Sequence, residues 1–279
     1  MKILFLGDIF GKPGREAIKE YLPKIKRKYE IDLVIANAEN CSHGKGLTME
    51  HYYYLRKLGI DFFTMGNHTW AKNDIKEVLS QNNIVRPANL NPNFQYATCG
   101  VGTNTIEVKN KIIRITNILG ISVTNMESII TNSFNSLEQI INDVSKPNEI
   151  HIVDLHAETT SEKNAFGIYF DGKVHAILGT HTHVPTNDLR ISPKGTFYIT
   201  DVGMCGPGFG SVIGAKAENA ISKFLDPNKK FKLEVSTYGW QLNGVILEFD
   251  NLTNQPIHCE QIRTKKDDPS YLMWKMEDN

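Results

Sequence analysis

Residues Val174–Pro185 read VHAILGTHTHVP: an apolar run stops at Gly179, and His181 and His183 follow two positions apart. We expect the run to form a buried β-strand. Side chains two positions apart in an extended segment point to the same face, so both imidazoles are predicted to converge just beyond the strand. Ligands of α/β sheets commonly bind at such strand ends. The two histidines can hold one metal ion, or one each of a close pair; the alternative is two loop histidines without a ligand.

The same arrangement recurs along the chain. Four other apolar runs of similar length end in side chains of metal-ligating type, namely Asp8, Glu39 with Asn40, Asn67 with His68, and His156. If these strands lie side by side, their ends form one cluster. Mixed oxygen and nitrogen ligands suit Mn, Fe or Zn. The set exceeds the needs of one ion, and a carboxylate such as Glu39 can bridge two ions roughly 3.5–4 Å apart, as in two-metal hydrolases.

Each of these residues also has an ordinary structural explanation. Asp8 can cap a turn, Glu39 and Asn40 can be polar loop groups, and His156 can be a hydrogen-bonded core histidine. The coincidence of five strand ends favours a shared site over five separate structural roles.

The first part of the chain alternates strands with helices, which predicts a mainly parallel sheet covered by helices. The expected strands are Lys2–Leu6, Ile31–Ala36 and Asp61–Met65. A loop is expected over Ile9–Gly14. The expected helices are one carrying Ile18, Leu22, Ile25 and Tyr29 with a kink at Pro23, one through Leu58 with Thr48 as N-cap, and one over Asp74–Gln81.

The pattern then changes. We expect a hairpin over Ala97–Leu119 around Lys109-Asn110-Lys111, a helix over Ser136–Val144 and a strand over Glu149–Leu155. Antiparallel strands are expected over Phe197–Asp201, Phe231–Tyr238 and Gly244–Phe249, and a short helix over Ala217–Phe224. The glycine-rich loop Gly206–Gly214 either lines a pocket or forms a subunit contact. Without repeats, linkers or charge blocks, residues 1–279 are expected to form a single domain.

Composition limits the partners. Lys+Arg and Asp+Glu number 31 each, so the formal net charge of zero provides no global field for long nucleic acid or an anionic membrane. No apolar run approaches the ~20 residues of a membrane span, and the N-terminal run is too short for a signal peptide. Four scattered cysteines argue against a disulfide framework or a zinc knuckle. We expect a cytoplasmic protein, with homo-oligomerisation left open.

Taken together, the ordered motifs resemble the calcineurin-like metallophosphoesterases, and more narrowly the YmdB-type branch of cyclic-nucleotide phosphodiesterases. The motifs are GDxxG (Gly7–Gly11), NAEN (Asn37–Asn40), GNH (Gly66–His68), DLHAE (Asp154–Glu158) and GTHTH (Gly179–His183). The likeness spans nearly the whole chain and includes SEKNAFG at 161–167. It implies an α/β (α+β) protein with the four-layer metallophosphoesterase fold, a β-sandwich core flanked by helices.

The resemblance also implies roles for individual residues. Two divalent or trivalent ions are expected, Fe or Mn first and Zn as an alternative. The implied ligands are Asp8, Glu39, Asn40 and His183 for the first ion, and Glu39, Asn67, His156 and His181 for the second, with Glu39 bridging. His68 would be the general acid. His43, in the loop after Glu39, is a weaker candidate for contact with substrate phosphate, and a surface role is its alternative.

Three positions depart from the wider superfamily. Phe10 stands where its first motif usually has histidine, Glu39 stands where its second motif usually has aspartate, and Ala71 stands where an acidic residue is expected. The first two fit the YmdB-type branch, and together they leave the first ion with fewer nitrogen ligands.

The expected activity is hydrolysis of small 2′,3′- or 3′,5′-cyclic nucleotides. Two cations neutralise the phosphodiester and activate a water, and a histidine beside a ligand can protonate the leaving oxygen. Two alternatives stay open. One is a different phosphoesterase, such as a nucleotidase or phosphomonoesterase. The other is a metal-bound regulatory module that binds a nucleotide or a partner with little turnover.

Overall fold

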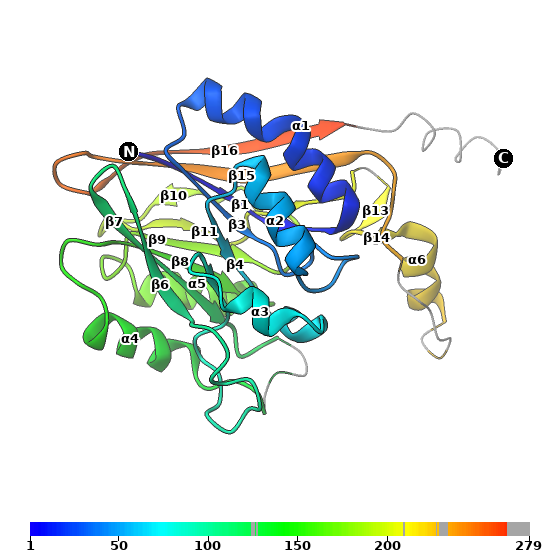
Figure 1. Ribbon diagram of the computed structural model, residues 1–279, viewed down its shortest axis with the longest axis horizontal. Coiled ribbons are helices and arrows are strands. Elements are labelled where there is room, and N and C mark those ends of the chain that lie inside the picture. Colours follow the sequence, from blue (N-terminus) through cyan, green and yellow to red (C-terminus); the bar gives the residue numbers. More distant parts are fainter. Residues whose placement is uncertain (124–125, 127, 209, 227, 229–233, 267–279) are drawn as a thin grey trace.

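Two six-stranded β-sheets lie face to face in the computed structural model, which describes residues 1–123, 126, 128–208, 210–226, 228 and 234–266 (Figure 1). Helices cover the outer face of each sheet. One layer of buried apolar side chains lies between the sheets, and one more lies between each sheet and its helices. The two sheets and the helices on either side of them form four layers, which confirms the predicted α/β sandwich.

The first sheet contains the three strands predicted at the start of the chain. Its order is β16 (Pro256–Lys266), β15 (Trp240–Phe249), β1 (Lys2–Leu6), β3 (Leu33–Asn37), β4 (Phe62–Thr64) and β5 (Ile84–Val85). Strands β1, β3, β4 and β5 are parallel, and β15 is antiparallel to both β1 and β16. Along β1, Ile3 and Phe5 face the second sheet while Leu4 and Leu6 face the helices. Burial on both faces explains why this run is continuously apolar.

The second sheet has the order β10 (Arg190–Ile191), β11 (Phe197–Ile199), β9 (Ala176–Thr180), β8 (Ile150–His156), β7 (Lys111–Leu119) and β6 (Thr103–Val108). The predicted β6–β7 hairpin is confirmed. Its turn residues Lys109 and Asn110 have φ of 51° and 62°, the left-handed backbone that a two-residue hairpin turn requires.

The prediction for Phe197–Asp201 was wrong in direction. Strand β11 pairs with β9 in parallel, and only β10 runs antiparallel to it. Of the predicted strand Phe231–Tyr238, residues 231–233 lie outside the described part of the chain. In the described remainder, Val235 makes one isolated bridge with Ala215 instead of a strand.

Helices α1 (Gly11–Tyr29), α2 (Met49–Leu58) and α3 (Ile75–Leu79), with the short 3₁₀ turn η1 (Thr69–Ala71), lie on the first sheet. Helices α4 (Ser133–Asp143) and α5 (Thr160–Tyr169) cover the second. Helix α6 (Ala217–Leu225) adjoins the strand pair β13 (Ser211–Val212) and β14 (Ala215–Lys216), and β2 (Asp8–Ile9) pairs with β12 (Met204–Cys205).

Helix boundaries follow local chemistry. The Thr48 side chain accepts a hydrogen bond from the His51 amide, as predicted for an N-cap, and Gly59 ends α2 with φ of 101°. Helix α1 begins at Gly11, earlier than predicted, and continues through Pro23. Helix α5 was not predicted. No helix in the described ranges is long and apolar enough to cross a membrane. All four cysteines are free.

Candidate metal centre

The predicted ligand residues meet at one end of the sandwich, where strands of both sheets terminate. The first sheet contributes Asp8 after β1, Glu39 after β3 and Asn67 after β4. The second contributes His156 at the end of β8 and His181 after β9. The strands are therefore not all neighbours in one sheet, as the simplest interpretation of the sequence assumed, and the cluster lies at the seam between two sheets.

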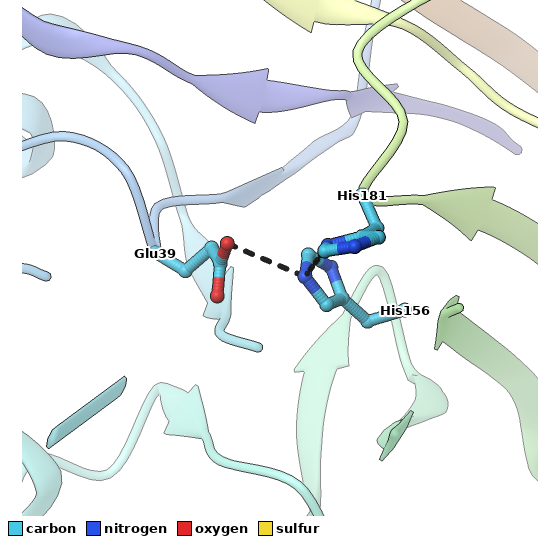
Figure 2. Close-up of side chains that lie close together, drawn as sticks. All are labelled: Glu39, His156 and His181. Carbon is cyan, nitrogen blue, oxygen red and sulfur yellow. Dashed lines mark hydrogen bonds and ion pairs between the residues drawn. The ribbon is translucent and has the colours of Figure 1, made fainter. Parts of the chain in front are cut away.

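Four of these side chains converge on one point. The His156 Nε2 atom lies 3.3 Å from Glu39 Oε1, 3.1 Å from His181 Nδ1 and 3.0 Å from Asn67 Oδ1. Figure 2 shows Glu39 facing the two imidazoles across this point. Ligand atoms of Glu39, His156 and His181 all lie within 4.8 Å of one another, a span that one cation can bridge.

A second group adjoins the first through Glu39. Asn40 Nδ2 donates a hydrogen bond of 2.9 Å to Glu39 Oε1 and lies 3.2 Å from His183 Nε2. The same His183 atom is 3.8 Å from Asp8 Oδ1. Asn40 thus faces its neighbours with its amide nitrogen, so its predicted ligand role requires the amide to turn over and present oxygen.

The outer hydrogen bonds of the histidines set their tautomers. His183 Nδ1 donates to the Ile213 carbonyl at 2.8 Å, and His181 Nε2 donates to Glu158 Oε2 at 2.8 Å. His156 Nδ1 donates to Thr180 Oγ1 at 2.8 Å, because the Thr180 hydroxyl proton is given to Asp154. Each remaining ring nitrogen carries a lone pair that points into the cluster. This is the arrangement by which outer partners orient metal-ligating histidines.

The cluster fits bound cations. Lone pairs of two imidazoles, an amide oxygen and a carboxylate face one another without a proton between them. Asp8 Oδ1 is buried and has no hydrogen-bond partner, which is costly for a carboxylate oxygen unless a cation compensates it. Gly66 packs against the group so closely that a Cβ there would lie 2.4 Å from Glu39 Oε2 and 2.5 Å from His156 Nε2.

Burial favours the neutral forms of the ionisable groups in the cluster. It lowers the pKa of His156 to about 4, and it also lowers the pKa of His181. Both imidazoles are therefore neutral near pH 7, the form that binds metal. Burial raises the pKa of Asp154 to about 7, although hydrogen bonds from Thr180, Thr64 and Asn37 oppose that rise.

The two histidines after β9 reach the cluster by a route that differs from the prediction. The strand ends at Thr180, and His181 and His183 have φ of 94° and 68°, so the segment is not extended. His181 points toward His156, and His183 points toward Asp8 and Asn40. The prediction that they share a site agrees with this geometry, but the extended-strand reasoning behind it was wrong.

His68 lies beside the cluster. Its backbone amide donates a 2.7 Å hydrogen bond to Glu39 Oε2, and burial lowers the pKa of its imidazole. It lines a cleft of about 740 Å³ that opens on the cluster. The walls also carry Lys45, Lys72 and the exposed His43, which places the weaker sequence candidate within the same cleft.

Phe10, and Ile213 of the Gly206–Gly214 loop, also line that cleft. Phe10 stands at the position of the expected superfamily histidine and packs edge-on against His183, with ring centroids 5.3 Å apart. Ile213 of the loop lines the cleft and supplies the carbonyl that holds His183. The pocket-lining alternative for this loop therefore agrees with the structure.

Several supporting residues were missed from the sequence. Glu158 orients His181, and Asp154 holds Thr180, which orients His156. Both acids lie in the DLHAE motif, and Asp154 is two residues before His156 on the same face of β8, a spacing that could have identified it.

The chain has the fold of the calcineurin-like phosphoesterases. A solved calcineurin-like phosphoesterase from Bacillus subtilis shares the fold with a TM-score of 0.52 at 10% identity, over 99% of this chain and 96% of that one. The chain belongs to the YmdB-like protein family, whose profile matches residues 4–262.

Relatives are similar over nearly their whole length. A Mycoplasma genitalium protein provisionally named a phosphatase/phosphodiesterase is 54% identical over 98% of this chain and 96% of its own. A Bacillus subtilis 2′,3′-cyclic-nucleotide 2′-phosphodiesterase is 40% identical over 96% of this chain and 98% of its own. The crystal structure of a Mycoplasma pneumoniae protein described as a novel phosphatase has a TM-score of 0.94 at 51% identity, covering 98% and 96% of the two chains.

Proposed function

We propose that this phosphoesterase hydrolyses small cyclic nucleotides, 2′,3′- or 3′,5′-cyclic, with two bound metal ions. The observation that carries the proposal is the convergence of Glu39, Asn67, His156 and His181 on one point. Two of these residues, Glu39 and His181, also line the 740 Å³ cleft. The 40% identical Bacillus relative is named for hydrolysis of 2′,3′-cyclic nucleotides, which supports the same substrate class for this chain.

Asp8, Glu39, Asn40 and His183 would hold one ion, and Glu39, Asn67, His156 and His181 the other. The ions, once bound, would supply positive charge at the phosphate and lower the pKa of a water to about 7. Iron or manganese suits this mixed oxygen and nitrogen set, and zinc is the alternative.

His68 would protonate the departing sugar oxygen. Burial lowers the pKa of its imidazole, so the protonated ring is a stronger acid than an exposed histidine. The negative charge of a bound phosphodiester favours that protonated form. Lys45 and Lys72 in the cleft walls add local positive charge to a chain with no net charge, which favours binding of a small anion at this place.

The His68→Ala variant tests this assignment. Because the hydrogen bond from His68 to Glu39 comes from the backbone amide, the variant is expected to keep the metal content of the unchanged protein. Its turnover should fall by about 10²–10⁴-fold, the contribution typical of a general acid. His258→Ala, at an exposed position on β16, is the matched control and should retain full activity. Full activity of the His68 variant would remove this residue as the acid.

Elemental analysis of the purified protein, paired with hydrolysis of 2′,3′- and 3′,5′-cyclic AMP, tests the whole proposal. The expected result is about two ions per chain with turnover of one or both nucleotides. Turnover of p-nitrophenyl phosphate without turnover of either cyclic nucleotide would favour a phosphomonoesterase, which the description of the Mycoplasma pneumoniae protein supports as the second candidate. Two ions without turnover of any phosphoester would favour a regulatory module.

A further inference from the structure

Lys163 is a fully buried lysine close to the metal centre that the proposed mechanism does not use. It extends from α5 to the end of β9 and is 1% exposed. Its Nζ atom donates hydrogen bonds of 2.7 Å to the Thr180 carbonyl and 2.7 Å to Asp201 Oδ2. Lysine is almost never buried so completely unless it is paired.

Asp201 links Lys163 to Thr182, in the turn Thr180–His183 that carries both histidines. The oxygen that pairs with Lys163 also accepts hydrogen bonds from the Thr182 amide at 3.1 Å and the Thr182 hydroxyl at 2.7 Å. Its second oxygen accepts from the Gly203 amide at 2.8 Å. Thr182 lies between His181 and His183, so the ion pair fixes the backbone on both sides of His181.

The backbone of His181 and His183 adopts a conformation that needs support from its surroundings. His181 and His183 both have positive φ, a region that residues with a side chain adopt only when their surroundings hold them there. The Lys163–Asp201 pair binds the carbonyl just before this turn and the amide in its middle. Without those two contacts, an extended segment would aim the two imidazoles differently.

A second buried ion pair in the same sheet provides a comparison. Arg114 Nε and Nη2 donate to the two carboxylate oxygens of Glu149 at 2.6 Å and 3.0 Å. Glu149 immediately precedes β8, whereas His156 ends that strand. The sheet thus has one buried ion pair near the metal centre and one at its opposite end.

We propose that Lys163 is a positioning residue of the metal site, whose ion pair with Asp201 holds the Thr180–His183 backbone so that both histidines point at their ligand positions. The inference rests on the proposed metal site. Replacing a buried ion pair with neutral groups is often close to neutral for stability, so the geometry of the turn, and not the stability of the sheet, is what this pair is expected to determine.

The test compares two double variants that remove both charges of a pair together. Lys163→Met with Asp201→Asn alters the pair beside the turn, and Arg114→Met with Glu149→Gln alters the distant pair. Titration calorimetry of Mn²⁺ into metal-free protein gives the dissociation constant, and thermal unfolding of the same samples gives Tm. We expect the first variant to bind Mn²⁺ at least about tenfold more weakly and the second to stay within about twofold of the unchanged protein.

Equal weakening by both double variants, or no weakening by the first, would overturn the inference while leaving the metal site intact. Failure of the unchanged protein to bind Mn²⁺ would overturn the proposed metal site itself, and the inference with it. If the first double variant does not fold, the Thr182→Val variant tests the inference instead. It removes only the hydrogen bond from the Thr182 hydroxyl to Asp201. It should weaken Mn²⁺ binding severalfold at nearly unchanged Tm, and an unchanged dissociation constant would overturn the inference.

Discussion

At the scale of single residues, the cluster is defined by which atoms face inward. Glu39 has one oxygen 3.3 Å from His156 and the other bonded to the His68 amide, so it borders both proposed ion positions and the proposed acid. Asp8 leaves one buried oxygen without a hydrogen-bond partner. These two carboxylates account for the negative charge that would attract cations to a neutral chain.

Glu39→Gln is expected to reduce the metal content from about two ions per chain to one or none, because a neutral amide is a weak bridge between cations. Elemental analysis of the variant measures this directly. Glu50→Gln, at an exposed position in the first turn of α2, is the control and should match the unchanged protein. Unchanged metal stoichiometry in the Glu39 variant would refute the bridging assignment.

At the scale of elements, β8 carries a buried histidine at each end with different partners. His156 faces the candidate metal centre, whereas His151 Nε2 lies 2.8 Å from Thr116 Oγ1 and its other nitrogen 3.3 Å from Ser145 Oγ. Burial, with smaller contributions from the nearby Arg114 and His175, lowers the pKa of His151 to about 3. The folded protein therefore keeps His151 neutral under conditions that protonate it in the unfolded chain.

This difference predicts acid sensitivity with a definite sign. The stability that neutral His151 contributes is fully present above pH ~6.5 and is lost as the pH falls toward 3, because the unfolded chain alone takes up the proton. The loss amounts to about 2 kcal/mol at pH 5. Urea unfolding of metal-free His151→Gln at pH 7 and pH 5 should show a correspondingly smaller drop than the unchanged protein. His258→Gln should show the full drop, and identical drops in all three proteins would contradict the prediction.

Some strands and helices could be predicted from the sequence, and others could not. Strands β1, β3 and β4 were predictable because burial on both faces makes them continuously apolar. Strand β16 has mostly exposed side chains and β5 has two residues, so neither has a readable pattern. The buried residues of helix α5 are Lys163, Phe166 and Gly167. Because one of these is a lysine, the buried face of the helix does not appear as an apolar pattern in the sequence. Strand direction in the second sheet depends on crossovers that residue patterns do not encode.

The candidate site was more predictable than the fold around it. Its ligand-type residues follow recognisable runs, so their types and positions are visible in the sequence. The supporting contacts of Glu158, Asp201 and Lys163 join residues that are distant in sequence, and only the assembled fold brings them into contact. The positive φ at His181 likewise follows from those contacts and not from its neighbours.

At the scale of the whole molecule, the distribution of charge favours a small anion over a long one as the proposed substrate. Equal numbers of acidic and basic residues leave no net field, and the cleft that carries Lys45 and Lys72 also carries Glu158 and Glu234. A short anion can use the lysines locally, whereas a long polyanion gains nothing from the rest of the surface.

A single-stranded oligonucleotide of about 30 residues is therefore expected not to inhibit hydrolysis of cyclic AMP, even at about tenfold molar excess and low salt. Adenosine monophosphate at the same phosphate concentration is the comparison and should compete. Strong inhibition by the oligonucleotide that weakens steeply with added salt would contradict this expectation.

The pairing of β1 has a consequence for how the chain is made. The strand that leads to Asp8 lies between β3 and β15, and β15 spans Trp240–Phe249. During synthesis from the N-terminus, the first strand therefore lacks one of its two neighbours until β15 has been translated. His183, which faces Asp8, is itself translated 175 residues after it. A nascent chain shorter than 183 residues therefore cannot present the complete set of proposed ligands to a metal ion.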